Sequence, residues 1–274
     1  MRLISWNINF RSDCAQHIYA LKKREPDIVV LQEVNPNTLS QLRTGLRGIE
    51  LTCVKDNKDI AVQFGRVHYF ALIASRWPLT VLSNDAFRVP FPESVFAAVV
   101  SNPTTDFELH TTHIPPGSSH GWVKIETFEG IYNRLTSFAS RPRILCGDFN
   151  SPRQEKFDGR IVTWGQTEKS NVLRKGRERW DAGERCVIEG LRDFDLIDVF
   201  RFLHGYEVQE YSIVMKHKDK ITRRRFDHVF ASSLLNATAC HYLHELRERG
   251  LSNHSPIEVD FAPKSNKSSN GPMP

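Results

Sequence analysis

Apolar and polar positions along the chain predict a mixture of strands and helices. Residues 2–8 (RLISWNI) alternate and are rich in β-forming side chains, which indicates a strand. Residues 27–34 (DIVVLQEV) and 143–150 (RILCGDFN) are apolar runs that end in polar residues, a pattern typical of strands buried on both faces. All three segments therefore predict strands that carry polar side chains at their ends.

Further strand-like segments follow one another closely. The predicted ranges are 51–55, 60–64, 67–75, 79–87, 95–101, 106–112, 209–215, 224–232, 236–243 and 256–261. Strands in series without helices between them favour antiparallel pairing.

Helical segments alternate with some of these strands. Helices are predicted over 14–24, 37–46 and 122–138, and helical material around a break over 186–203. Ser12 and Asp13 can cap the first of these helices. Residues 153–182 are polar and charged, and we expect a long loop there. The succession predicts one domain over residues 1–262, of α/β (α+β) class, with helices packed on largely antiparallel sheets. Residues 263–274 are polar and rich in Pro, Gly and Ser, which predicts a disordered tail.

The composition is that of an ordinary globular protein with a modest positive excess. Of the 274 residues, 40% are hydrophobic and 25% are charged, and the formal net charge is +5, which favours polyanionic partners. Five single cysteines form no CxxC pair, which disfavours a zinc cluster and fits a reducing compartment. The sequence shows no signal peptide and no stretch of transmembrane length, so we expect a soluble, cytoplasmic protein. No obligate protein partner is evident.

Polar residues recur at the ends of the predicted strands. They are Asn7, Glu33, His113, Asp148, Asn150, Asp227, Asn253 and His254. Taken singly, an Asn or Asp at a strand end is usually a turn former, and a lone histidine usually belongs to the core or the surface. Taken together, they are the residue types that metal-assisted phosphoryl chemistry needs: hard oxygen ligands for Mg²⁺ or Mn²⁺, and histidines that exchange protons near neutral pH.

Six motifs carry a resemblance to a known family. They are SWNIN, DIVVLQEV, HIPPG, ILCGDFNSP, RFDHVFAS and LSNHSPI, in this order. Over roughly residues 1–262 the chain resembles the endonuclease/exonuclease/phosphatase superfamily, and most of all its exonuclease III and apurinic/apyrimidinic endonuclease branch. The resemblance implies a four-layered α/β sandwich with two central mixed, largely antiparallel sheets. It also implies hydrolysis of a phosphoester that depends on Mg²⁺, with Mn²⁺ as a substitute.

On the metal side, the resemblance implies that Glu33 binds the cation and that Asn7 supports or shares it. Asn253 stands where the family usually has an aspartate near the metal, so we expect weaker metal binding at that edge and retained chemistry. His113 stands where one branch usually has tyrosine and the deoxyribonuclease I-like branch has histidine, and it would contact the phosphate or protonate the leaving oxygen. Glu93 is the nearest candidate for the glutamate that supports this histidine in the latter branch.

On the water side, the resemblance implies that Asp148 activates or positions the attacking water. Asn150 matches the amide that holds the phosphate and orients that aspartate. Asp227 matches the carboxylate that pairs with the terminal histidine, His254, whose protonated form would stabilise charge on the phosphate.

Two basic clusters bear on the substrate. One holds Lys216, Lys218, Lys220, Arg223, Arg224 and Arg225, and the other holds Arg174, Lys175, Arg177 and Arg179 beside Trp180. Basic residues next to aromatic ones can follow a phosphate backbone and stack bases, although such runs are often only solvated loops. Because the first cluster flanks Asp227, we expect nucleic acid, and DNA in the first place, as the partner.

Three functions remain open at this point. The first is a Mg²⁺-dependent DNA nuclease of the exonuclease III/AP endonuclease type. The second is a phosphatase or phosphodiesterase that acts on a small molecule or a lipid head group, for which residues 87–96 (FRVPFPESVF) are a candidate membrane-facing loop. The third is a nucleic-acid-binding protein with a weakened site.

Overall fold

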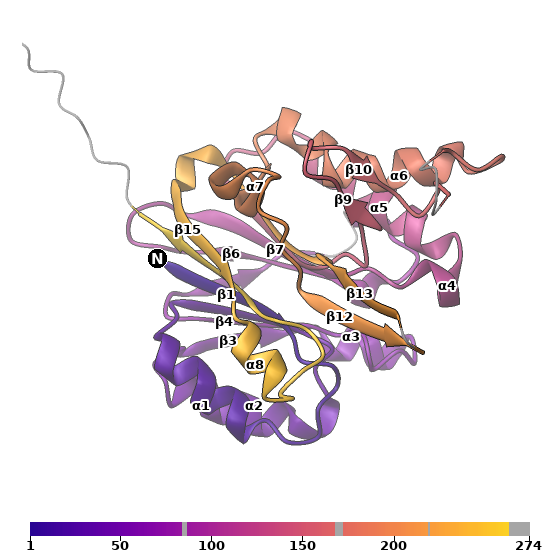
Figure 1. Cartoon of the computed structure of the whole chain (residues 1–274). Helices are drawn as coiled ribbons and strands as arrows, with labels where there is room; N and C mark the ends of the chain where they lie inside the picture. Colours follow the sequence, from indigo (N-terminus) through magenta and orange to yellow (C-terminus); the bar gives the residue numbers. More distant parts are fainter. Residues whose placement is uncertain (84–86, 168–171, 219, 263–274) are drawn as a thin grey trace, which may run out of the picture.

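The computed structural model describes residues 1–83, 87–167, 172–218 and 220–262, and two stacked sheets form its centre (Figure 1). The first sheet has the order β15 (Ala237–Tyr242), β16 (Ile257–Phe261), β1 (Arg2–Asn7), β2 (Ile28–Gln32), β4 (Leu72–Ser75) and β3 (Cys53–Asp56). The second has the order β11 (Ile197–Asp198), β14 (Asp227–Ala231), β8 (Arg143–Asp148), β7 (Phe107–His113), β6 (Val95–Val100) and β5 (Leu79–Val81). Two small sheets pair β9 (Gln154–Glu155) with β10 (Ile161–Val162), and β12 (Ile213–His217) with β13 (Lys220–Arg224).

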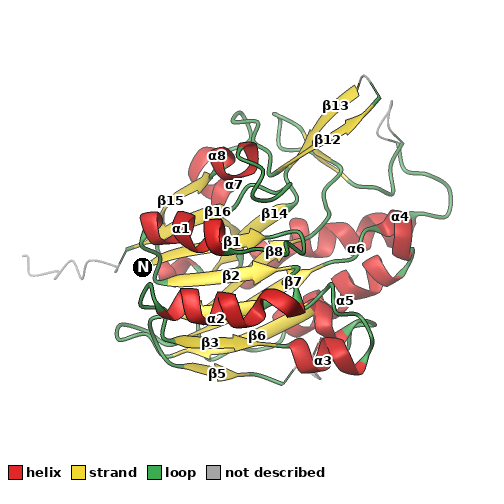
Figure 2. Ribbon diagram, turned by 90° about the horizontal axis from the view of Figure 1, so that it is seen from below, coloured by secondary structure: helices red, strands yellow, loops and turns green. Residues whose placement is uncertain are grey.

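Helices cover the outer faces of both large sheets (Figure 2). The helices are α1 (Ala15–Arg24), α2 (Leu39–Arg47), α3 (Lys58–Gln63), α4 (Gly117–His120), α5 (Val123–Leu135), α6 (Glu178–Ile188), α7 (Val199–His204) and α8 (His244–Glu248). Among the described residues, no helix is both long and apolar enough to cross a membrane.

Three apolar clusters separate the layers. The central cluster lies between the two sheets and includes Leu3 and Val30. Their neighbour Ile4 points to the opposite face, into the cluster under α1 and α2. On the second sheet, Leu145 joins Phe128 of α5 in the third cluster. Helices, sheet, sheet and helices therefore form the expected four-layered sandwich, with two mixed sheets in which β1–β2 and β7–β8 are parallel.

The structure corrects several expected elements. Residues 60–63 of the segment expected as a strand belong to helix α3, of which Ala61 packs into the cluster under α1 and α2 while Val62 is exposed. The range 153–182, expected as a loop, contains β9, β10 and the start of α6. Parts of the expected strand at 79–87, and the whole predicted tail at 263–274, lie outside the described residues.

Candidate active site

The strand ends of both sheets meet at one edge of the molecule. Asn7 is the last residue of β1, and Glu33 follows the parallel strand β2. His113 and Asp148 end the parallel strands β7 and β8 and lie opposite each other in the ladder. Because β14 runs antiparallel to β8, its first residue, Asp227, also pairs with Asp148. The topology thus gathers side chains that are far apart in the sequence.

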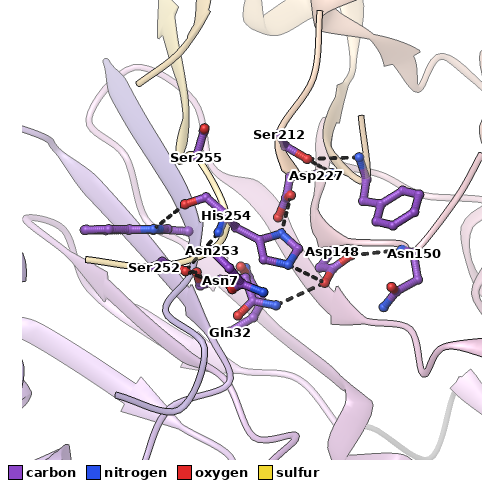
Figure 3. Close-up of polar contacts among 12 residues, drawn as sticks. Asn7, Gln32, Asp148, Asn150, Ser212, Asp227, Ser252, Asn253, His254 and Ser255 are labelled. Atoms are coloured by element: carbon purple, nitrogen blue, oxygen red, sulfur yellow. Dashed lines mark hydrogen bonds and ion pairs between the residues drawn. The ribbon is translucent and has the colours of Figure 1, made fainter. Parts of the chain in front are cut away.

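The buried carboxylate of Asp148 lies at the centre of this group (Figure 3). Its Oδ2 lies 3.7 Å from Nε2 of His113 and 3.7 Å from Nε2 of His254, and it accepts a hydrogen bond of 3.0 Å from the Asn7 amide. Its Oδ1 accepts the main-chain N–H of Asn150 at 2.9 Å. Burial raises the pKa of Asp148, against the opposing effect of His254. The environment therefore favours a carboxylate that can accept a proton.

His254 and Asp227 form a buried pair, with 2.7 Å between Nδ1 and Oδ2. Burial alone would lower the pKa of His254, but the carboxylates of Asp227 and Asp148 outweigh it and raise that pKa to about 9. At neutral pH the imidazole is therefore protonated, and its Nε2–H faces Asp148. The Ser212 hydroxyl accepts the main-chain N–H groups of Phe226 and Asp227 at 3.0 and 3.1 Å, which fixes the start of β14.

The Asn7 amide holds two carboxylates side by side. Its Nδ2 donates to Glu33 Oε1 at 2.9 Å and to Asp148 Oδ2 at 3.0 Å, while its Oδ1 accepts a main-chain N–H. The nitrogen, and not the oxygen, faces the carboxylates, so this arrangement favours the supporting role of Asn7 over direct ligation of a cation. Asn253 is exposed, and its Oδ1 lies 3.5 Å from Oγ of Ser252.

The trio of Glu33, His113 and Asp148 fits a divalent cation. One donor atom from each lies within 4.8 Å of the others, and His113 Nε2 is 3.3 Å from Glu33 Oε1. Two carboxylates and an imidazole suit Mg²⁺ through the oxygens and Mn²⁺ through all three. Asp148, Asp227 and His254 lie within the same distance of one another, but the last two are already hydrogen-bonded together. The trio with Glu33 is therefore the better candidate.

The turn after β8 explains the order of residues in GDFN. Gly147 has a φ of 135°, and a Cβ at this position would lie 2.0 Å from the carbonyl oxygen of Thr112 on the neighbouring strand, so only glycine fits. Asn150 is left-handed, with a φ of 49°, and its N–H bonds Asp148. Its Nδ2 donates to the carbonyl of Ile114 at 2.9 Å, which leaves the second hydrogen of the amide for a phosphate oxygen.

The β12–β13 hairpin carries part of the first basic cluster. A β-bridge joins Ile213, at its base, to His254, so the hairpin is attached directly to the catalytic candidate. The hairpin stands out from the body of the molecule (Figure 2). Lys216, Lys218 and Arg223 are exposed on it. Cationic side chains thus project from the edge of the site.

Two residues expected at the substrate are buried, which contradicts that expectation. Arg225 is 3% exposed, and its guanidinium lies 2.6 Å from Glu155 and 2.5 Å from Asp198. Trp180 is 6% exposed, and its Nε1 donates to Glu184 at 2.8 Å. Arginine-rich spacing does not reveal which member turns inward to neutralise buried carboxylates. Of the remaining predicted contacts, Arg224 is half-buried, and Arg174 and Lys175 are exposed in the loop before α6.

An aromatic residue that was not among the predicted site residues, Tyr69, lies beside His113. The ring of Tyr69 lies 5.1 Å from that of His113, and its hydroxyl is 3.1 Å from Nε2 of His120. Glu93 is buried and pairs with Arg66 at 3.4 Å. Within the described part of the chain, the second oxygen of Glu93 and Nδ1 of His113 both lack a hydrogen-bond partner. Glu93 therefore does not support this histidine through a hydrogen bond.

The comparisons with known proteins concern the family and the fold. A family model described as the Endonuclease/Exonuclease/phosphatase family matches residues 4–254. An AP endonuclease from Archaeoglobus fulgidus is 17% identical with a TM-score of 0.71, and the match covers 95% of this chain and 99% of that chain. The 3′ phosphatase NExo from Neisseria, in a structure bound to a product DNA hairpin, is 17% identical with a TM-score of 0.65, over 96% of this chain and 99% of that chain.

A further structure of the same fold is that of D. rerio TDP2 complexed with a single-strand DNA product. It is 17% identical with a TM-score of 0.65, and the match covers 96% of this chain and 98% of that chain. No curated protein matches the sequence. Fold and site together define a hydrolase of phosphoric esters. The chain belongs to the Endonuclease/Exonuclease/phosphatase family.

Proposed function

We propose that this enzyme is a Mg²⁺-dependent nuclease that hydrolyses phosphodiester bonds of DNA. The observation that carries the proposal is the basic β12–β13 hairpin, because its base is bridged to His254 while Lys216 and Lys218 are exposed. Cations at this place would bind the phosphates next to the one that is cleaved. A small phosphoester would not extend to them.

Each residue of the site would have a separate role in hydrolysis. A divalent cation held by Glu33, with Asp148 beside it, would neutralise the phosphate and the leaving oxygen. Asp148 would position the attacking water and take its proton, which its raised pKa favours. His254, kept protonated by Asp227, would donate its Nε2–H to a phosphate oxygen, and the second hydrogen of the Asn150 side-chain amide would donate to another.

A lipid phosphoester is a weaker alternative for this chain. In the segment 87–96, Phe87 and Phe96 are buried, and the ring of Phe91 lies 3.8 Å from the guanidinium of Arg66. These phenylalanines therefore do not form an exposed apolar loop that could enter a membrane.

Cleavage of labelled DNA tests the proposal. The purified protein would be incubated with a duplex that carries an abasic site, with the same duplex without one, and with a single strand, each in Mg²⁺ and in EDTA. We expect cleavage of at least one substrate in Mg²⁺ and none in EDTA. Hydrolysis of p-nitrophenyl phosphate or of a phosphocholine ester without cleavage of any DNA substrate would overturn the assignment and favour the small-molecule or lipid function.

A further inference from the structure

Lys124, in the first turn of helix α5, is buried next to the site although no catalytic role has been assigned to it. The residue is 1% exposed, and its Nζ donates to the main-chain carbonyl of Asn150 at 2.8 Å. Its counterion is Glu184 of α6, with 3.2 Å between Nζ and Oε1. Glu184 is itself fully buried and accepts hydrogen bonds from Nε1 of Trp180 and from the main-chain N–H of Trp164.

Stability alone does not explain a charged pair at this place. Removing an ammonium and a carboxylate from water costs several kcal/mol each, and apolar residues of similar volume often serve the fold as well or better. Burial accordingly lowers the pKa of Lys124, while Glu184 opposes this effect. What a methionine at position 124 could not supply is a hydrogen-bond donor directed at the Asn150 carbonyl.

The carbonyl of Asn150 matters because the same residue bonds the Asp148 carboxylate. It also accepts a hydrogen bond of 3.1 Å from Nε1 of Trp164, so two side-chain donors hold it. On its other side, the Asn150 N–H bonds Asp148 Oδ1. Since Asn150 also has a left-handed φ, donors at its carbonyl restrain the rotation that would withdraw its N–H from Asp148.

We propose that Lys124, held by Glu184, is a positioning residue that fixes Asn150 and, through the Asn150 N–H, the Asp148 carboxylate. The inference rests on the catalytic role proposed for Asp148. The ammonium of Lys124 is enclosed by protein, so Lys124 would affect the reaction only through the backbone of the GDFN turn.

Three variants separate a positioning role from a structural one. Lys124→Met/Glu184→Gln removes the charge pair without leaving a buried charge unpaired. Glu184→Gln alone keeps the amine and its bond to Asn150 but removes its counterion, so this variant is the less stable of the two. Trp164→Phe removes the second donor to the carbonyl and keeps an aromatic ring at this position. Arg24→Met/Glu258→Gln, which removes an ion pair of 2.5 Å away from the site, is the matched control.

Of the two variants that change Glu184, we expect the more stable one to be the less active one. The double variant at 124 and 184 should be the more stable, yet kcat should fall about tenfold or more with KM within about threefold of wild type, the effect of one lost orienting hydrogen bond. Glu184→Gln should keep kcat within about threefold, Trp164→Phe should lose less than the double variant, and the control pair should leave kcat unchanged. Equal kcat in the wild type and the folded double variant, or an equal loss in the double and Glu184→Gln, would overturn the proposal.

A second measurement does not depend on catalysis. Amide hydrogen exchange in the metal-free protein reports the Asn150 N–H directly, and we expect it to exchange faster in the double variant and in Trp164→Phe than in the wild type or the control. Unchanged protection in these two variants would refute the positioning role. Because this readout needs no substrate, it stays informative if the wild type cleaves no DNA, and failure of the proposed function is then recognised separately.

Discussion

Replacing Asp227 by asparagine removes the carboxylate that lies 2.7 Å from Nδ1 of His254 while it keeps the size of the side chain. The wild-type histidine has its pKa raised from 6.5 to about 9, and Asp227 is the foremost cause of the increase. Without that carboxylate we expect the pKa to return to about 6.5, since burial lowers it and only more distant carboxylates oppose this. At pH 8 the protonated fraction then falls from about 0.9 to about 0.03, so protonation alone predicts a loss of about thirtyfold in kcat/KM.

The same change affects stability with a defined sign. Because the folded-state pKa of His254 is raised, its charged form stabilises the fold fully below about pH 6.5, and this contribution is lost as the pH rises through 9. At about 1.4 kcal/mol per pH unit, Asp227→Asn should lower the free energy of unfolding by up to about 3 kcal/mol below pH 6.5, and the deficit should shrink above pH 9.

Two assays measure this effect. NMR titration of the His254 imidazole in the metal-free protein gives its pKa directly, and the pH dependence of kcat/KM gives the alkaline limb. Glu210→Gln is the control, because it removes a carboxylate that lies 2.9 Å from Nε2 of His244, outside the site. The reasoning is refuted if Asp227→Asn leaves the His254 pKa and the alkaline limb where they are in wild type, or if the control shifts them equally.

The remaining predictions concern four features of the site and its surroundings. Asp148→Asn should lower turnover by orders of magnitude and yet raise the melting temperature, because burial already disfavours the ionised aspartate; a melting temperature below wild type in calorimetry would contradict this. Arg225→Met should cost about 3–5 kcal/mol in chemical denaturation, since it removes a buried guanidinium that two buried carboxylates share and leaves Glu155 with Arg201 alone. Lys216→Ala with Lys218→Ala should leave stability unchanged within about 0.5 kcal/mol and reduce the salt slope of DNA binding by up to about 2, which fluorescence anisotropy at several salt concentrations measures. Asn253→Asp should lower the Mg²⁺ concentration needed for half-maximal activity; an identical metal titration would mean that this residue only supports its turn.

The sequence predicted the strand ends of the site well, for a physical reason. A polar residue at the end of an apolar run is costly to bury in the core. We therefore expected Asn7, Glu33 and Asp148 where a buried strand reaches the edge of its sheet. The resemblance then assigned His254 to Asp227, and the observed hydrogen bond joins them. Neither step needed side-chain geometry.

The direction in which a side chain points, and its burial by the fold, could not be predicted in this way. A cluster of arginines does not indicate that Arg225 turns inward, because the carboxylates that require it, Glu155 and Asp198, are remote in sequence. Periodicity over six residues does not separate a short helix from a strand, which explains the error at 60–64. The sequence did not indicate that Lys124 is buried, because a lysine on a helix is usually solvated and only the fold encloses this one.

The order of strands in the first sheet also bears on when the site residues can come together. Strand β16 lies between β15 and β1, so the last strand of the domain completes the sheet that the first one begins. His254 lies three residues before that strand begins, and pairings of such long sequence separation form late. During synthesis a ribosome therefore carries a chain that has most of the site but lacks the histidine. The full set of site residues is therefore present only once His254 and β16 have been synthesised.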